Sequence, residues 1–449
     1  MTATAAAIDT AAEPPAARQL GFWMAAALVV GNIIGAGVFL LPASLAPFGA
    51  NAAWGWLLTI SGCLCLALVL GLLAARIEGG PYEYVRSTMG ELPAFLVMWS
   101  YWVSIWGGSA ALSIAFTSYL SSLVPGIGSG LAAPAVAIGA LWAATLVNMR
   151  GARTAGSLQL VTTTLKLVPL IAAIIVAAIL LGDGQASATL VPVPVSTGGI
   201  ASVAAMATFA MLGFECATLP AGKVRNPARN VPLATVFGTL FAGLVTLAAC
   251  LAVLFLLPGN VAATSAAPFA DAISPVLGSV AGSVVAAFAV VSVLGCLNGW
   301  VLCSGEVPLA MARAGVFPAW LGRTTAIGTP VRAQILSSAV TSLLIVSNYS
   351  GSLAAVFTFV ILVSTVSSLF LYVAAAVAAL KLRIGSAFAL LGIAFAAFAF
   401  WGAGREASLW GMALLAAGLP IYWLMRRASS RAASPAAAAV PAALPESSS

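Results

Sequence analysis

Long apolar runs separated by short polar segments recur along this chain from residue 20 to residue 425. Many of them have roughly 20 residues, the length of a helix that crosses the hydrocarbon core of a bilayer. Hydropathy places about twelve such spans along the chain. They are Leu20–Leu45, Ala52–Ala75, Leu92–Leu123, Leu131–Asn148, Leu158–Leu181, Gly198–Leu219, Pro232–Leu257, Val276–Leu302, Val331–Val346, Leu353–Leu380, Ala387–Phe400 and Leu409–Met425. The pattern predicts an all-α integral membrane protein.

Two of these spans are interrupted in the same way. In the first span Pro42 follows seven residues after Gly35, and in the sixth span Pro220 follows seven residues after Gly213. Glycine and proline favour unwinding, and unwound backbone at membrane depth is tolerated only where it is buried in protein or lines a cavity. Paired interruptions in the two halves of a transporter indicate its substrate site. We therefore expect broken first and sixth helices.

The position of the breaks also predicts an internal repeat. Spans one to five (20–181) and six to ten (198–380) can be laid over one another with the breaks aligned. Because each repeat has an odd number of spans, the second must be inverted, which predicts a 5+5 inverted repeat with two helices appended. The transporter domain is expected at 18–427. The flanking segments 1–17 and 428–449, rich in alanine, proline and serine, are expected to be disordered cytoplasmic tails.

Composition and charge agree with a membrane location. The chain is 62% hydrophobic and 6% charged, whereas soluble domains have roughly 25% charged residues. Nearly all of the 18 lysines and arginines fall in alternate loops, and the other loops hold only Arg405. Since basic loops stay in the cytoplasm, the protein is expected in the cell (inner) membrane with both termini on the cytoplasmic side. The net charge of +7 then reflects topology, and we expect the lipid bilayer, not nucleic acid, as the partner.

The residue inventory excludes several kinds of chemistry. There is no histidine, and the six cysteines lie in apolar runs. We expect no metal site, no cofactor and no disulfide framework. Without histidine an intramembrane enzyme has no Ser–His dyad, and no nucleotide-binding motif supports an ATP-driven pump. A receptor or sensor with a transporter-like body is a further alternative, which would bind substrate without flux.

The breaks suit a small zwitterion. Unwound segments expose peptide N–H groups and carbonyls, and helix ends carry partial charges of about half a unit. We expect amides around Ala36 and Gly37 to bind a carboxylate, and carbonyls of Ile33, Phe209 and Leu212 to bind an ammonium. The alternative is that the glycines only allow close helix packing. The expected binding stretches comprise Ile33, Gly35, Ala36, Gly37, Phe209, Ala210 and Leu212.

Three motifs carry a family resemblance: Gly35-Ala36-Gly37, Glu215, and the run Asn226-Pro227-x-Arg229-Asn230-Val231-Pro232. With them the chain resembles the amino acid–polyamine–organocation (APC) permeases, above all the arginine/agmatine and other basic amino acid/polyamine antiporters. The resemblance implies a LeuT-like fold and secondary active antiport of a small amino acid or amine by alternating access. A proton-coupled or exchanging permease for neutral amino acids is the alternative. The resemblance also implies that the protein could form a homodimer, in which the last two spans would make the contact.

The resemblance assigns roles to individual residues. Glu215, the one acid deep within a predicted span, is implied in pH sensing and gating. The alternative is a neutral carboxyl bonded to backbone or tyrosine. Tyr101 is its expected gate partner or a core residue.

Trp300 is expected to cover a cationic substrate group, or only to pack against its neighbours. Phe209 stands where the antiporters have a tryptophan, and Phe370 stands where they have a tyrosine of the inner gate. The side-chain pocket is expected to include Ser104, Ile105 and Ser109, the last in place of an asparagine.

Lys166 lies roughly eight residues into span five, about 12 Å along a helix. It could extend to the cytoplasmic interface. Alternatively its ammonium faces the first break and replaces the sodium ion of sodium-coupled relatives, in a proton-linked step.

Overall fold

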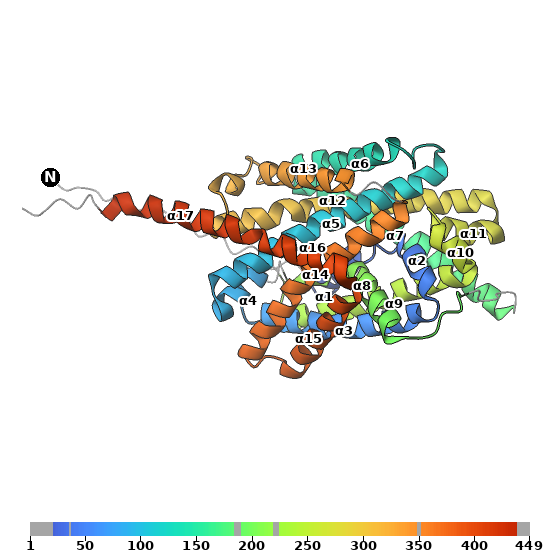
Figure 1. The fold of residues 1–449 in the computed structure, drawn as a ribbon, viewed down its shortest axis with the longest axis horizontal. Coiled ribbons are helices and arrows are strands. Elements are labelled where there is room, and N and C mark those ends of the chain that lie inside the picture. The colour runs from blue at the N-terminus through green and yellow to red at the C-terminus, as the bar shows by residue number, and fades with distance from the viewer. Residues whose placement is uncertain (1–20, 36, 184–189, 219–223, 348–351, 438–449) are drawn as a thin grey trace, which may run out of the picture.

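The computed structural model describes residues 21–35, 37–183, 190–218, 224–347 and 352–437. α-Helices and short 3-10 turns make up the regular structure of these residues, and no β-strand occurs among them (Figure 1). The expected all-α architecture is confirmed.

Within the described residues, eight helical segments are long and apolar enough to cross a membrane. They are α3 (Asn51–Ala74), α5 (Glu91–Leu123), α6 (Ala132–Met149), the part Leu165–Gly182 of α7 (Ala152–Gly182), α9 (Pro227–Leu256), α12 (Ser279–Arg313), α14 (Leu353–Lys381), and Gly404–Arg427, which combines α16 (Gly404–Ala416) with part of α17 (Gly418–Ala437). Shorter apolar helices are α1 (Phe22–Ile33), α8 (Thr197–Met211), α13 (Val331–Ser347) and α15 (Ser386–Gly402). The connecting elements include α2 (Leu41–Leu45), η2 (Phe214–Ala217), α4 (Gly80–Met89), α10 (Gly259–Thr264) and α11 (Pro268–Leu277).

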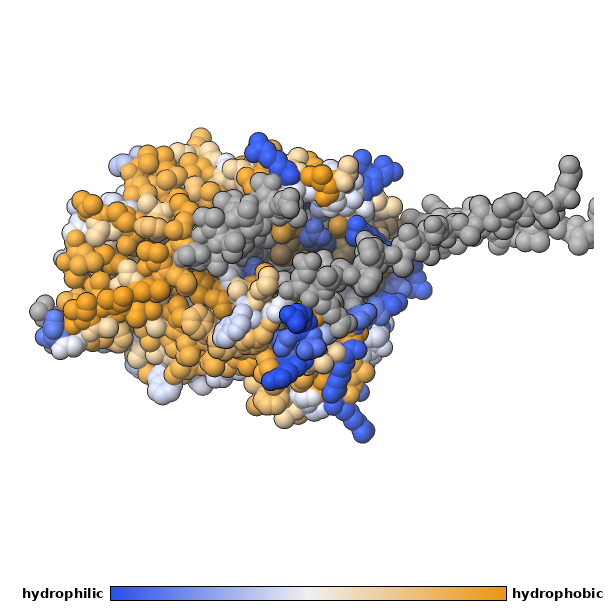
Figure 2. All heavy atoms as spheres, turned by 180° about the vertical axis from the view of Figure 1, so that it is seen from behind, coloured by the Kyte–Doolittle hydropathy of each residue, from blue (hydrophilic) through white to orange (hydrophobic). Residues whose placement is uncertain are grey.

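The outer surface is suited to lipid. Figure 2 shows a broad apolar surface, with charged residues gathered toward the end of the molecule where α4 and α17 lie in Figure 1. An apolar surface of this extent needs a membrane or a partner to cover it, as expected of a multi-pass membrane protein.

The helices pack in two groups. In one group α5 is buried along most of its length by α6, α12 and α13, and α14 packs along the same helix. The other group contains α1, α3, α8 and α9. Hydroxyl groups join α5 to α14: Ser100 Oγ donates to the carbonyl of Ser367 at 2.8 Å, and Ser364 Oγ donates to that of Ser104 at 2.7 Å. Such interhelical hydrogen bonds replace the hydrophobic driving force that is missing in lipid.

Two predicted boundaries differ from the structure. The eighth span was predicted at Val276–Leu302, but Gly278, with φ +89°, separates α11 from α12, which continues to Arg313. Ser304 and Glu306 lower the hydropathy after residue 302, but the helix continues there and packs against α13, where the Ser337 hydroxyl donates to the carbonyl of Ser304 at 2.9 Å. Hydropathy measures solubility in lipid and not helix formation, so the predicted span ends at Leu302 although the helix continues to Arg313.

The segment between the second and third predicted spans contains the short helix α4. At the other end of the chain, α17 continues to Ala437. The segments 1–17 and 438–449 lie outside the described residues.

Candidate functional site

Both predicted breaks interrupt a helix at a glycine with positive φ. α1 ends at Ile33 and α8 ends at Met211, and the second residue after each end is a glycine, Gly35 with φ +117° and Gly213 with φ +114°. Glycine adopts such angles readily, whereas other residues are strained there. Unwound backbone therefore occurs in both spans where the sequence indicated it.

The two breaks lie against each other. A methyl group on Gly213 would lie 2.9 Å from Cβ of Asn32, and one on Gly37 would lie 2.7 Å from Cδ1 of Phe209. Neither glycine can carry a side chain unless its neighbour moves. The peptide groups freed by the two breaks therefore share one region between the ends of α1 and α8.

The expected binding stretches surround this region. Ile33, Phe209, Ala210 and Leu212 are buried, while Ala36 lies outside the described residues. The carbonyl of Phe209 accepts a hydrogen bond from the N–H of Leu212 at 3.1 Å. One of the three carbonyls expected to bind an ammonium therefore already has a partner.

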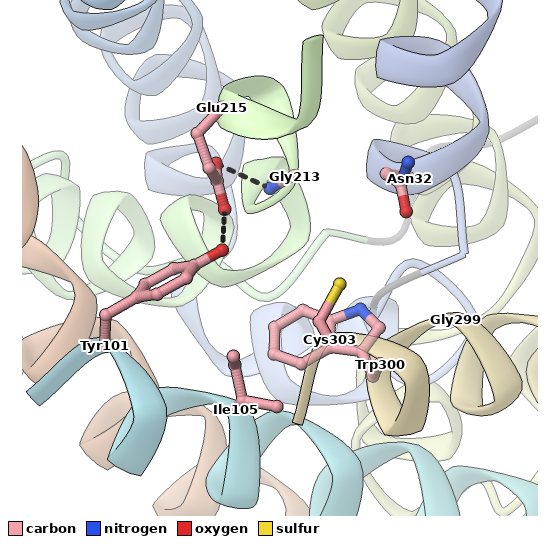
Figure 3. Close-up of a pocket in the computed structure, with 8 residues that line it drawn as sticks. All are labelled: Asn32, Tyr101, Ile105, Gly213, Glu215, Gly299, Trp300 and Cys303. Atoms are coloured by element: carbon pink, nitrogen blue, oxygen red, sulfur yellow. Dashed lines mark hydrogen bonds between the residues drawn. The ribbon is translucent and has the colours of Figure 1, made fainter. Parts of the chain in front are cut away.

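A small cavity lies beside the second break (Figure 3). Its volume is about 20 Å³, room for about one water molecule. It is lined by Asn32, Tyr101, Ile105, Gly213, Glu215, Gly299, Trp300 and Cys303. Of these, Tyr101, Ile105, Glu215 and Trp300 were expected at the site. An amino acid does not fit into this volume, so the cavity is closed to such a substrate in this conformation.

Sequence reasoning did not single out Asn32 or Cys303 as site residues. Asn32 is in the last turn of α1, where its Nδ2 donates to the carbonyl of Leu28 at 2.8 Å. Cys303 follows Trp300 by three residues, a spacing that puts both on one face of a helix. The spacing from Trp300 could have indicated Cys303 as a site residue, and the position of Asn32 beside the first break could have indicated Asn32.

The Glu215 carboxylate accepts three hydrogen bonds. The Tyr101 hydroxyl donates to Oε1 at 2.8 Å, and the Tyr372 hydroxyl and the N–H of Gly213 donate to Oε2 at 3.0 and 3.1 Å. Glu215 is 3% exposed. Phe370 stands two residues before Tyr372 on α14, and Tyr372 supplies a second tyrosine hydroxyl to the carboxylate, which the sequence did not indicate.

Lys166 points into the protein beside the first break. Its Nζ donates to the carbonyl of Gly31 at 3.0 Å, and the side chain is completely buried. A methyl group on Gly35 would lie 3.2 Å from Cδ and Cε of the lysine. The last turn of a helix carries partial negative charge, so the end of α1 offers a favourable site for the ammonium. The extension of Lys166 to the interface is not observed.

Trp300 both lines the cavity and packs against α5. Its ring lies 6.0 Å from that of Phe209, centroid to centroid, with an interplanar angle of 37°. A methyl group on Gly108 would lie 2.0 Å from its Cζ3. Glycine at this position of α5 therefore leaves the space that the indole occupies.

Two expected pocket residues do not line this cavity. Ser104 donates its hydroxyl to the carbonyl of Tyr101 at 2.7 Å, within α5. Ser109 is 2% exposed, and its Oγ has no hydrogen-bond partner among the described residues. Only Ile105 of the three expected pocket residues faces the cavity.

Acidic residues in the described part of the chain form no cluster that could hold a metal ion. The extension of α12 to Arg313 adds Glu306 to the acids within helices of membrane length, and its side chain is exposed. Glu215 is therefore the buried acid of the site, and three hydrogen-bond donors contact its carboxylate.

Comparison with known proteins supports a transporter. Residues 20–425 match the amino acid permease family. The chain is 33% identical over 328 residues to the cadaverine/lysine antiporter of Escherichia coli (strain K12), covering 72% of this chain and 73% of that protein. It is 30% identical to the putative arginine/ornithine antiporter of Bacillus subtilis (strain 168), covering 82% and 85%. It is 26% identical to the putrescine transporter PotE of Escherichia coli (strain K12), covering 91% and 96%.

Proposed function

The chain belongs to the amino acid permease family, and we propose that it is a secondary active antiporter that exchanges a basic amino acid for an amine. The similar proteins are transporters and not enzymes. The observation that carries the proposal is the meeting of two broken helices beside a cavity with a buried carboxylate. Exchange proceeds by alternating access of this central site to the two sides of the membrane.

In this proposal the peptide groups of the breaks bind the charged ends of the substrate. Amides of the first break, from Gly35 to Gly37, bind the carboxylate, and carbonyls of Ile33 and Leu212 bind the ammonium. Trp300 and Ile105 line the space for the substrate side chain, which supports contact between the indole and a cationic group. Because the cavity is small here, binding requires the two helix groups to separate at one end.

Glu215 is the proposed gate. Its carboxylate joins η2 to α5 and α14 through Tyr101 and Tyr372. Protonation would remove the charge that these donors stabilise, and the three elements could then separate. We propose that Glu215 is protonated in one transport state only.

Lys166 is the proposed cation of the first break, in the place that a sodium ion takes in sodium-coupled relatives. Its bond to the Gly31 carbonyl supports this role. The same observation favours the second candidate function, a proton-coupled or exchanging permease for neutral amino acids. A buried amine that can release its proton suits a proton-linked step.

We propose that the shorter apolar helices complete twelve spans, with inverted repeats at about 20–181 and 198–380, two appended helices, and a transporter domain at 18–427. Basic residues in alternate loops support cytoplasmic termini in the inner membrane. The C-terminal ends of α5 and α9 are then external. Exposed apolar side chains on α15, such as Leu390 and Trp401, support a homodimer through the appended helices.

Reconstituted vesicles test the function. The full-length protein is placed in liposomes preloaded with lysine, arginine, cadaverine, agmatine, putrescine or a neutral amino acid, and uptake of radiolabelled partner is measured. Uptake of a basic amino acid or amine that requires internal substrate is the expected result. Uptake driven by a pH gradient into empty vesicles would favour the proton-coupled permease, and binding without uptake would indicate a sensor.

A further inference from the structure

The hydroxyl of Tyr119 connects three elements near the C-terminal end of α5. It donates a hydrogen bond to the carbonyl of Phe39 at 2.8 Å and accepts one from the N–H of Phe269 at 3.2 Å. The tyrosine is completely buried. Because a hydroxyl is both donor and acceptor, one oxygen atom joins α5, the segment before α2 and the start of α11.

Neither backbone group has a partner in its own helix. In a continuous helix the carbonyl of Phe39 would accept from the N–H of Ala43, but that N–H bonds to Leu40 at 3.1 Å. Phe269 is in the first turn of α11, where N–H groups have no intrahelical acceptor. Buried peptide groups without partners are costly. Tyr119 therefore satisfies two groups, one of them left by the first break.

Neighbouring contacts strengthen the connection. The ring of Phe39 lies edge-to-face on those of Tyr119 and Phe269, with centroids 5.9 and 5.7 Å away. The hydroxyl of Ser118 donates to the carbonyl of Ala266 at 2.7 Å. Two successive residues of α5 thus hold the chain that leads into α11.

This contact crosses from one group of helices to the other, since Tyr119 is on α5 and Phe39 belongs to the broken helix that packs with α9. When one group rocks against the other around a central site, contacts between them at one end must separate as that end opens. We propose that Tyr119 is a positioning residue for transport, whose hydroxyl holds the outer half of the first broken helix against α5 and keeps the external side closed. This inference rests on the transport function and orientation proposed above.

Two native cysteines can report the opening of each side. Cys250 is completely buried on α9, near the C-terminal end that is external in the proposed orientation. Cys303 lines the central cavity, one turn closer than Trp300 to the cytoplasmic end of α12, and is half-buried. External opening should expose Cys250, and cytoplasmic opening should expose Cys303.

The test uses full-length protein in membranes, with every cysteine except one of these two replaced by alanine. A charged, membrane-impermeant thiol reagent is added externally for Cys250 and to inside-out vesicles for Cys303. Tyr119→Phe keeps the ring and removes both hydrogen bonds. We expect Cys250 to react about tenfold faster, the effect of losing one or two hydrogen bonds of ordinary net strength. Cys303 should react more slowly, because the two sides open alternately.

Matched variants keep the result interpretable. Tyr82→Phe makes the same chemical change on α4, where the described residues include no hydrogen bond to its hydroxyl, and should leave both rates unchanged. Ser118→Ala removes only the bond to Ala266 and should shift both rates in the same directions as Tyr119→Phe, but less. It serves as the second variant if Tyr119→Phe does not fold.

An unchanged Cys250 rate in a folded variant would overturn the inference. Faster reaction of both cysteines would also overturn it, because that result means general loosening of the helices. Failure of the proposed function is distinguishable: wild-type protein would then transport no basic amino acid or amine. The opposed labelling changes would still decide whether Tyr119 closes the external side.

Discussion

Tyr372 and Tyr101 hold opposite oxygens of one carboxylate: the Tyr372 hydroxyl donates to Oε2 of Glu215 at 3.0 Å, while Tyr101 donates to Oε1 at 2.8 Å. The two tyrosines come from α14 and α5, and Glu215 lies in the turn that follows the second break. Any movement of that turn away from α5 must therefore break a hydrogen bond to a buried carboxylate. This relationship couples the state of Glu215 to the packing of three elements.

Replacing Tyr372 by phenylalanine should slow exchange. The variant keeps the ring that packs 4.7 Å from Phe214 but removes one donor to Glu215. A hydrogen bond to a charged group is worth about 1.5–3 kcal/mol, so we expect the closed gate to be depopulated about ten- to hundredfold relative to the open one. Exchange, which needs both states in turn, should slow. Radiolabelled exchange in vesicles measures it. Tyr422→Phe, the same change on α17, should retain the wild-type rate.

Glu215→Gln should flatten the dependence of exchange on pH. Glutamine has the same size and can still bond to the tyrosines, but it does not ionise. Initial uptake rates are compared with wild-type at acidic and neutral pH. Glu91→Gln, which removes an exposed acid from the start of α5, should keep the wild-type profile. A wild-type profile in Glu215→Gln would contradict the gating role.

Lys166→Met should lower the exchange rate about tenfold or more, because it removes the ammonium that bonds to the Gly31 carbonyl and leaves that buried acceptor without its donor. Methionine keeps most of the apolar stem. Thermal unfolding of the purified variant separates a folding defect from a transport defect. Wild-type exchange in a folded Lys166→Met protein would refute a role of Lys166 in coupling.

Gly213→Ala should destabilise the second break. The new methyl group would lie 2.9 Å from Cβ of Asn32, at a φ of +114°. The strained backbone costs about 1–3 kcal/mol, and overpacking adds about 1–3 kcal/mol. We expect lower thermal stability and loss of exchange. The control is Gly198→Ala in the first turn of α8, where a methyl group meets nothing within 4 Å and both properties should be unchanged.

Trp300→Ala should weaken binding of basic substrates more than neutral ones. A cation over an indole gains about 0.5–2 kcal/mol, which corresponds to roughly two- to thirtyfold in KM. KM values for a basic and a neutral amino acid are measured in the same vesicles. Trp300→Phe should keep part of the preference. An equal rise in KM for both substrates would mean that the indole only packs against Gly108.

The sequence by itself determined the features that depend on local chemistry. Apolar runs of bilayer length predict helices whatever their neighbours are, and glycine followed by proline predicts where two of them unwind. The positions of Gly35 and Gly213, with positive φ just after a helix end, agree with that reasoning. Family motifs and the alternation of basic loops are also properties of the linear chain.

Only the tertiary structure decided which side chains meet. Phe370 and Tyr372 are two residues apart, about 200° around a helix, so helix packing alone selects Tyr372 as the partner of Glu215. The sequence allows Lys166 to face either the interface or the interior. The structure selects the interior, because the Gly31 carbonyl near the end of α1 accepts a hydrogen bond from its ammonium. Tyr119 reaches Phe39 across 80 residues and Phe269 across 150. Contacts at such separations depend on how rigid helices dock, and no local pattern along the chain encodes that docking.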